Sequence, residues 1–298
     1  MLINKIGEFG LIERIRKTIP LDSLVVKGSG DDCAVIKFKR DKFLLFTCDM
    51  IVQDVDFTSK TNPYLVGRKA LAVSISDIAA CAGIPKYAVV SVGLPKFFTV
   101  EKADRVIKGL LDLAKKYKIN IVGGDISKAP KLTLDVSLLG EVEKKYLALR
   151  SGAKVGDVIF VSGSLGGSIL GKHLTFSPRL KEARFLVKNF KVNSMIDISD
   201  GLAADLGHIL KESGVGAVIY EKLIPRSRQA KDLEDCLYSG EDFELLFTLS
   251  AKFAKRLIKR RLKQFSAIGE IVDKRFSFRL VDKNCKERII KPKGFRHF

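Results

Sequence analysis

Short apolar segments alternate with segments of helical periodicity along the whole chain of 298 residues. Strands are predicted where apolar residues run together between turn-forming residues. These segments are residues 43–48, 87–94, 119–122, 132–142, 158–162, 217–220 and 244–249. Helices are predicted over residues 63–80, 100–117 and 200–214, where apolar side chains recur every three or four positions. Thr99 is placed to cap the second helix and Gly214 to end the third. The mixture of both elements predicts an α/β or α+β fold.

A polar, turn-rich stretch, "EVEKKYLALRSGAKVGD" at residues 141–157, lies between two of the apolar strands. The chain is long enough for two domains, and it has no low-complexity linker. We therefore predict an N-terminal domain over residues 1–143 and a C-terminal domain over residues 144–298, packed closely together.

The composition narrows the class of protein. Hydrophobic residues make up 46% of the chain, enough for a full core. No apolar run reaches the roughly 18–20 residues that span a bilayer, and the N-terminus has no signal-peptide pattern. The five cysteines are odd in number and have no CxxC spacing, which favours reduced thiols over disulfides or a zinc site. We expect a cytoplasmic protein without a membrane segment.

The formal net charge of +19 has three interpretations. It can serve nucleic-acid binding, attract small anionic substrates, or reflect a surface rich in Lys and Arg of the kind found in thermophiles. Basic residues are spread along the whole chain, and no basic motif is interleaved with aromatic residues. Nucleic-acid binding is therefore the least favoured interpretation.

Nine carboxylate residues of this chain are flanked by apolar residues or glycines, which is unusual for charged side chains. They are Asp31, Asp32, Asp49, Asp77, Asp125, Asp197, Asp200, Glu241 and Asp242. We expect nearly all of them at the ends of strands or helices, Asp49 and Asp125 as the last residues of strands. Taken singly, Asp31 suits a turn and Asp200 suits a helix cap. Taken together, with no matching set of His or Cys, they suit a hard cation such as Mg²⁺ or Mn²⁺.

Two glycine-rich stretches accompany these acids. "SGSLGGSILG" at residues 162–171 follows a predicted strand and suits either a phosphate cradle or a tight turn. "VGGD" at residues 122–125 allows close backbone approach beside an acid. Neither stretch is a Walker A or dinucleotide motif. Cys48 is interpreted as a structural thiol and the three histidines as structural or solvated. Acids, glycines and positive charge together suggest nucleotide-dependent phosphoryl transfer.

An ordered set of motifs resembles the thiamine-monophosphate kinase family over nearly the whole chain. The motifs are "GEFGLIERI", "GSGDDCAVI", "TCDMIV", "KALAVSISDIAA", "VGGDIS", "LRSGAKVGDVIFVSGSLGGS", "MIDISDGLAADLGHIL", "YSGEDFELLFT", "IGEI" and "KGFRHF". The resemblance places the chain in the superfamily of aminoimidazole ribonucleotide synthetase, selenophosphate synthetase and a hydrogenase maturation factor. It implies an N-terminal α/β domain that dimerises through its sheet, and a C-terminal α+β domain. The implied reaction converts ATP and thiamine monophosphate to ADP and thiamine diphosphate, with several Mg²⁺ ions.

The resemblance also implies roles for individual residues. The positions implied to surround Mg²⁺ are Asp32, Thr47, Cys48, Asp49, Asp77, Asp125, Asp197 and Asp200. Those implied to contact ATP are Gly124, Asp125, Arg150 and Ser199, and those implied to contact the substrate are Asp56, Glu241 and Phe295. Asp31 is expected to brace its turn or to bind metal through water. No protein nucleophile or general base is expected, because the attacking phosphate is mostly deprotonated at pH 7.

This chain departs from the family pattern at four places. Asp56 stands where many relatives have a histidine, and Cys48 stands where a hydroxyl residue is usual. The usual "AAMGA" reads "AACAG", with the glycine one place late, and the terminal aromatic residue is Phe295 and not tyrosine. The alternatives are a sister enzyme of the superfamily, a basic nucleic-acid-binding protein and a nucleotide-binding homologue without activity. Selenophosphate synthetase would need a reactive cysteine nearer the N-terminus, and none precedes Cys33. The hydrogenase maturation factor would need a C-terminal cysteine, whereas this sequence ends in "FRHF".

Overall fold

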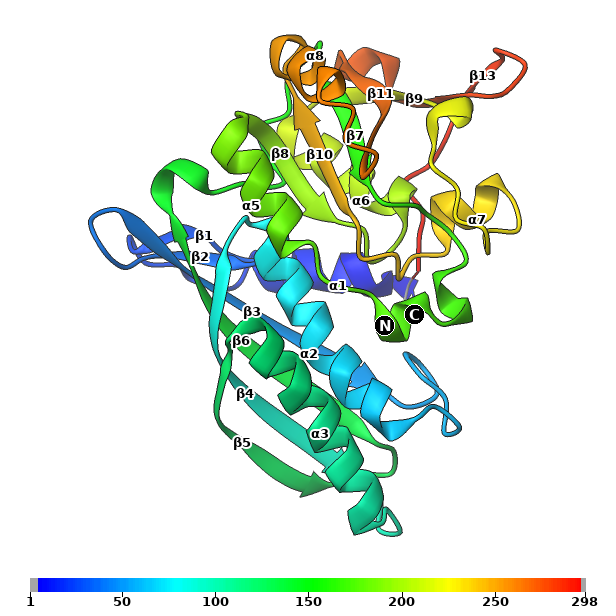
Figure 1. Ribbon diagram of the computed structural model, residues 1–298. Helices are drawn as coiled ribbons and strands as arrows, with labels where there is room; N and C mark the ends of the chain where they lie inside the picture. Colours follow the sequence, from blue (N-terminus) through cyan, green and yellow to red (C-terminus); the bar gives the residue numbers. More distant parts are fainter. Residues whose placement is uncertain (1–4, 296–298) are drawn as a thin grey trace.

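Two β-sheets form the framework of the protein, whose computed structural model describes residues 5–295 (Figure 1). The first sheet has the order β1-β2-β3-β6-β4-β5 and is antiparallel except between β4 and β5. Its strands are β1 (Val25–Lys27), β2 (Ala34–Lys37), β3 (Lys42–Val52), β4 (Ile84–Leu94), β5 (Asn120–Lys128) and β6 (Thr133–Glu143).

Two long helices, α2 (Pro63–Ala80) and α3 (Val100–Tyr117), lie side by side on one face of this sheet (Figure 1). Both were predicted with these bounds, and Thr99 caps α3 as expected by accepting a hydrogen bond from the Lys102 backbone N–H at 3.4 Å. The helices cross closely at two glycines. A Cβ added at Gly67 or Gly109 would lie 1.8 Å from a backbone carbonyl oxygen of the other helix.

No helix covers the opposite face of the first sheet within the described chain (Figure 1). Four large apolar side chains are exposed there on β3 and β4: Phe46 at 42%, Met50 at 58%, Tyr87 at 50% and Val89 at 43%. Asp125 belongs to this open face, because the register pairs it with Ser91 and pairs Ser91 in turn with Asp135 beside Met50.

The second sheet has the order β13-β12-β9-β11-β7-β10-β8 and is antiparallel except between β12 and β9. Its strands are β7 (Val158–Ser162), β8 (Val192–Asp197), β9 (Gly216–Tyr220), β10 (Leu245–Leu249), β11 (Phe265–Val272), β12 (Phe278–Val281) and β13 (Glu287–Ile289). The helices of this half are α4 (Lys172–Thr175), α5 (Leu180–Asn189), α6 (Leu202–Ser213), α7 (Leu233–Tyr238) and α8 (Ala251–Lys259). One face of the sheet packs with α6, and the other joins the core formed around α2.

Helix α2 connects the two halves of the molecule. It packs on β3 and β6 of the first sheet, and also on α4, α5 and β8 of the second half. Consistent with this position, 13 of its 18 residues are buried. Because α2 is buried on both sides, most of its side chains are small or apolar around the whole helix.

The expectation that Asp49 and Asp125 end their strands is wrong. β3 continues to Val52, with Asp49 paired to Val136, and β5 continues to Lys128. The backbone ladder extends past the end of the apolar run because side chains on an uncovered or site-facing part of a strand need not be apolar. None of the helices in the described part of the chain is long and apolar enough to cross a membrane.

Candidate functional site

Three buried or half-buried carboxylates meet at the junction of the two halves. Asp32 comes from the turn before β2, Asp77 from the last turns of α2 and Asp197 from the end of β8. Carboxylate oxygens of all three lie within 4.8 Å of one another. Elements far apart in the sequence therefore place three acidic groups at one point.

These carboxylates are poorly compensated. Two buried oxygens, Asp32 Oδ2 and Asp49 Oδ2, have no hydrogen-bond partner among the described residues. Burial, followed by the charge of Asp32, raises the pKa of Asp197 to about 8. Burial also raises the pKa of Asp49 to about 6, and burial with the charges of Asp49 and Asp197 raises the pKa of Asp77 well above its usual value. Such a cluster favours a bound cation.

The donors that reach the cluster are few. The Thr47 hydroxyl donates to Asp77 Oδ2, and the Ser76 hydroxyl donates to Asp197 Oδ2. Thr47 lies two residues before Asp49 on β3, so both side chains point to the face that α2 covers. A hydroxyl supplies one hydrogen bond but no positive charge, so it leaves the repulsion between carboxylates in place.

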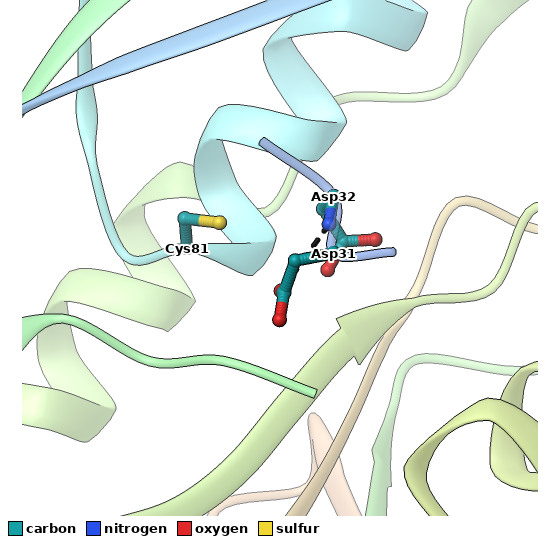
Figure 2. A group of neighbouring side chains, drawn as sticks. All are labelled: Asp31, Asp32 and Cys81. Atoms are coloured by element: carbon teal, nitrogen blue, oxygen red, sulfur yellow. Dashed lines mark hydrogen bonds between the residues drawn. The ribbon is translucent and has the colours of Figure 1, made fainter. Parts of the chain in front are cut away.

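Arg150 supplies the one guanidinium that directly pairs with the cluster in the described chain. Its Nη2 lies 2.7 Å from Asp32 Oδ1, and its backbone N–H donates to Asp31 Oδ1 and Oδ2 at 3.2 Å each. Asp31 also accepts from the Asp32 backbone N–H at 3.2 Å, the hydrogen bond drawn in Figure 2. Asp31 therefore braces the turn, which confirms one of the two roles expected for it.

The donor chemistry fits a hard divalent cation. Asp32, Asp77 and Asp197 offer only oxygen atoms, with Asp49 and Thr47 beside them, and Mg²⁺ prefers such ligands. Cys81, at the end of α2, brings a sulfur atom within 4.8 Å of oxygens of Asp31 and Asp32 (Figure 2). A thiol is a soft ligand and does not change the preference of the oxygen set.

Two predicted metal ligands lie apart from the three carboxylates in this chain. The Cys48 side chain points to the open face of the first sheet, where its Sγ lies 3.3 Å from both carboxylate oxygens of Asp135. Asp125 is exposed on the same face, at the edge strand β5. Roles for the Cys48 backbone carbonyl and for Asp125 stay predictions.

A cavity of about 460 Å³ opens over the cluster. Its floor includes Asp32, Asp49, Asp77 and Arg150. Its walls come from helix α1 (Gly7–Arg16), from α6, and from the loop that holds Ser199 and Asp200. Eight residues predicted to bind metal or ATP therefore line one cavity: Asp32, Thr47, Cys48, Asp49, Asp77, Arg150, Ser199 and Asp200.

The start of α6 differs from expectation. Asp200 does not cap the helix; instead the buried Asp205 carboxylate accepts hydrogen bonds from the backbone N–H groups of Asp200 and Gly201, at 3.1 and 3.0 Å. Asp200, Asp205 and His208 bring ligand atoms within 4.8 Å of one another. Burial lowers the pKa of His208 to about 4, so its ring is neutral at pH 7.

Two of the three predicted substrate contacts, Asp56 and Glu241, meet at one lysine of α2. Lys69, fully buried in α2, donates hydrogen bonds from Nζ to the Glu241 carboxylate and, at 2.9 Å, to the Asp56 backbone carbonyl. Asp56 lines a second cavity of about 420 Å³ between the two halves. Phe295 is anchored beside the first cavity, because its backbone N–H donates to the Asp200 carbonyl at 3.0 Å.

The glycine-rich loop is a tight turn and not a phosphate cradle. The Asp242 carboxylate accepts hydrogen bonds from the Gly166 backbone N–H at 3.0 Å and from the Ser168 hydroxyl at 2.5 Å. The acid thereby occupies the donors that a phosphate would use. Close packing of the backbone also requires a glycine at position 124, since a Cβ there would lie 2.0 Å from the Val90 carbonyl oxygen on β4.

Three residues of these sites escaped interpretation from the sequence. Lys69 lies within a helix of mostly small and apolar residues, and a charged residue in such a helix is the signal that could have marked it. Asp205 and His208 lie on α6 and have no motif of their own. Their positions depend on how α6 packs, which local sequence does not reveal.

Comparison with known protein families matches two domain models to the chain. Residues 30–142 match the N-terminal domain of AIR synthase related proteins, and residues 154–281 match the C-terminal domain of the same proteins. The thiamine-monophosphate kinase of Aquifex aeolicus is 34% identical over 100% of both chains. The chain belongs to the thiamine-monophosphate kinase family. The enzyme of Buchnera aphidicola from Schizaphis graminum is 35% identical, over 98% of this chain and 99% of its own.

Solved structures of the thiamine-monophosphate kinase family share the fold. AaThiL complexed with AMPPCP and TMP superposes with a TM-score of 0.86 at 32% identity, over 100% of this chain and 99% of that one. The hydrogenase maturation protein HypE, in its complex with HypF, has a TM-score of 0.75 at 18% identity, over 94% and 99% of the two chains. The predicted two-domain fold of the superfamily is thus confirmed.

Proposed function

We propose that this protein transfers the γ-phosphoryl group of ATP to thiamine monophosphate, which yields ADP and thiamine diphosphate. The observation that carries the proposal is the group Asp32, Asp77 and Asp197 under a cavity, in a chain that aligns end to end with thiamine-monophosphate kinases. AaThiL, the structural neighbour, was solved with AMPPCP and TMP bound.

The proposed metal ions would be held by Asp32, Asp77 and Asp197, together with Asp49 and Thr47. The two buried oxygens without partners, on Asp32 and Asp49, support this assignment. When bound, Mg²⁺ would neutralise the repulsion between the two phosphate-bearing substrates and stabilise the charge on the transferring group.

Arg150 is placed to bind the phosphates of ATP. Asp31 accepts a hydrogen bond from the Arg150 backbone N–H, and Asp32 accepts one from its guanidinium. Arg150 also lines the cavity. A guanidinium stays protonated at any working pH and recognises phosphate with two N–H groups. We assign Ser199, which also lines this cavity, to the ATP side of the site.

The reaction needs no side chain that removes a proton. The second pKa of a phosphate monoester is about 6, so the attacking oxygen of thiamine monophosphate carries a negative charge at pH 7. The bond from Pγ to the β–γ bridging oxygen breaks, a bond from Pγ to the acceptor oxygen forms, and ADP leaves. The residues position the two ligands in line and exclude water. Retention of configuration at the transferred phosphorus would contradict this direct transfer.

The thiamine group is proposed to lie toward the second cavity. Asp54 and Asp56 line it, and none of the described residues that line it is Lys or Arg. Its remaining lining includes Val55, Phe57 and Leu174, which suit an aromatic ring. Thiamine carries a permanent positive charge on its thiazolium ring, so an acidic and partly apolar cavity complements it.

The active form is proposed to be a homodimer that packs through the open face of the first sheet. Phe46, Met50, Tyr87 and Val89 give this face an exposed apolar surface of the kind that marks an interface. Asp125 lies on the same face and is separated from β3 by two strands. We propose that Asp125 of one copy completes the metal site of the other.

A product assay tests the proposed function. The protein, incubated with ATP, Mg²⁺ and thiamine monophosphate, should release one ADP for each thiamine diphosphate formed. Turnover on another phosphate acceptor without turnover on thiamine monophosphate would replace this proposal with a sister reaction.

A further inference from the structure

Helix α1 closes one side of the cavity above the three carboxylates. Glu8, Phe9, Ile12, Glu13 and Arg16 of this helix line the cavity. None of the ten residues of α1 is buried, and Ile12 is 41% exposed. A helix of this length gains most of its stability by packing an apolar face, and the apolar face of α1 is only partly covered.

The position of α1 is set by contacts to α6. The Phe9 ring meets the His208 ring edge-on, with centroids 5.2 Å apart. Glu13 pairs with Lys211 at 3.5 Å, and Arg16 pairs with Glu212 at 3.6 Å. The three contacts follow one face of each helix. They hold α1 so that Phe9 and Ile12 lie at the wall of the cavity.

We propose that Phe9 and Ile12 bind the nucleobase of ATP. The inference rests on the proposed function, in which ATP is the phosphoryl donor. The acids and Arg150 at the floor of the cavity take the phosphates. The ring of the same ligand then lies at the wall where the cavity offers an aromatic and an aliphatic side chain. A volume of about 460 Å³ lies within the range of small-molecule sites.

The composition of the cavity floor assigns this wall to the base of ATP. The acids and Arg150 below it would hold metal ions and the phosphates, so the ring of the same ligand comes within reach of Phe9 and Ile12. A purine is uncharged, whereas the thiazolium ring is a cation, and the second cavity offers that cation Asp54 and Asp56. The two rings of the reaction are thereby assigned to different cavities.

The test compares two ligands that share a triphosphate and differ in the base. Calorimetry with Mg²⁺ measures the dissociation constants of ATP and of inorganic tripolyphosphate for the full chain. Phe9→Ala and Ile12→Ala should each weaken ATP binding, Phe9→Ala by about 10-fold, because stacking on a base is lost. Their affinity for tripolyphosphate should stay at the wild-type value.

Ile15→Ala is the matched control. Ile15 lies on the same helix, is 46% exposed and does not line the cavity, so its removal should change neither affinity. Equal ATP binding by wild type and Phe9→Ala would overturn the proposal. Equal losses for ATP and tripolyphosphate would also overturn it, because they would show that α1 acts on the phosphates or on folding.

Amide exchange gives a second, independent measurement. ATP should slow exchange of the α1 amides, whereas tripolyphosphate should not, because only a base gives the helix an apolar partner. Protection by both ligands, or by neither, would contradict the proposal. Neither experiment depends on turnover of thiamine monophosphate. The assignment of Phe9 and Ile12 can therefore fail while the proposed function stands, and it can hold while the proposed function fails.

Discussion

Lys69 on α2 and Glu241 in the C-terminal half form an ion pair in which the lysine side chain is fully buried. The same ammonium holds the backbone carbonyl of Asp56 at 2.9 Å. One lysine thus connects the two residues predicted to contact thiamine monophosphate, and it joins the two halves of the molecule at the second cavity.

Replacing Lys69 with methionine should therefore affect both stability and substrate binding. Removing one partner of a buried ion pair typically lowers the free energy of unfolding by roughly 3–5 kcal/mol. For Lys69→Met we expect a loss of unfolding free energy near the lower limit of this range, since the Glu241 side chain is 23% exposed. The KM for thiamine monophosphate should rise more than the KM for ATP, as urea unfolding and steady-state kinetics will show.

Lys108→Met is the control for this variant. Lys108 is exposed and lies 3.6 Å from Asp112 on the surface of α3. Such pairs contribute about 0–1 kcal/mol. If Lys69→Met and Lys108→Met reduce stability equally, or if Lys69→Met leaves both KM values unchanged, the connecting role of Lys69 is wrong.

Asp77→Asn should reduce turnover by at least about 100-fold, since one charge that stabilises the transferring group is lost. The fold should stay intact, because the amide keeps the shape of the side chain and removes a carboxylate whose charged form burial disfavours. Circular dichroism and the product assay check the two parts. Asp112→Asn, an exposed acid on α3, should behave as wild type. Wild-type activity of Asp77→Asn would remove it from the metal site.

The stability of the metal-free protein should fall as the pH rises. The pKa of Asp197 is about 8 in the folded chain and about 4 in the unfolded chain. The folded state therefore binds more protons between these values, and its advantage is lost as pH increases from 4 to 8. With EDTA present, the gap in unfolding free energy between Asp197→Asn and wild type should widen from pH 5 to pH 8.

Added Mg²⁺ should narrow that gap, and more at pH 8 than at pH 5, because a cation binds the deprotonated form. Urea titrations at the two pH values measure both effects. A gap that does not change with pH would show that the Asp197 carboxyl titrates normally.

Two inactive variants test whether Asp125 acts across a dimer. If each site takes Asp77 from one copy and Asp125 from the other, a mixed dimer of Asp77→Asn and Asp125→Asn has one intact site. With half of the dimers mixed and half of their sites intact, activity should return to about a quarter of the wild-type value. No recovery after subunit exchange would place both residues in the same chain's site.

The open face of the first sheet should decide the oligomeric state. Met50→Asp puts a charge on its exposed apolar surface and should shift a dimer toward monomers in light scattering. Ile289→Asp places the same charge on β13, where the wild-type side chain is 66% exposed, and should leave the assembly unchanged. A Met50→Asp protein that stays dimeric would rule out this face as the interface.

Local features of the fold were predictable from the sequence. Helices α2 and α3 and strand β7 have the predicted bounds, because caps, turns and apolar periodicity lie within each segment. The strands β1, β8, β11, β12 and β13 were not predicted, since their pairing depends on partners far along the chain. Asp49 and Asp125 were misplaced for the same reason, because the ladder and not the apolar run sets where a strand ends.

The candidate site was predictable only in part. Asp32, Asp77 and Asp197 were assigned together by resemblance, and the fold places them together. Lys69 and Asp205 were missed because each gains its role from a tertiary contact, with Glu241 and with the backbone of Asp200. No local pattern records such contacts.

The most direct test of the whole account is the rate of phosphoryl transfer to thiamine monophosphate, measured beside other phosphate acceptors at one concentration of ATP and Mg²⁺. We expect thiamine diphosphate to form only with Mg²⁺ present, faster than any other product, and to be nearly lost in Asp77→Asn. Absence of thiamine diphosphate from the wild-type reaction, with ADP released on another acceptor, would contradict the account.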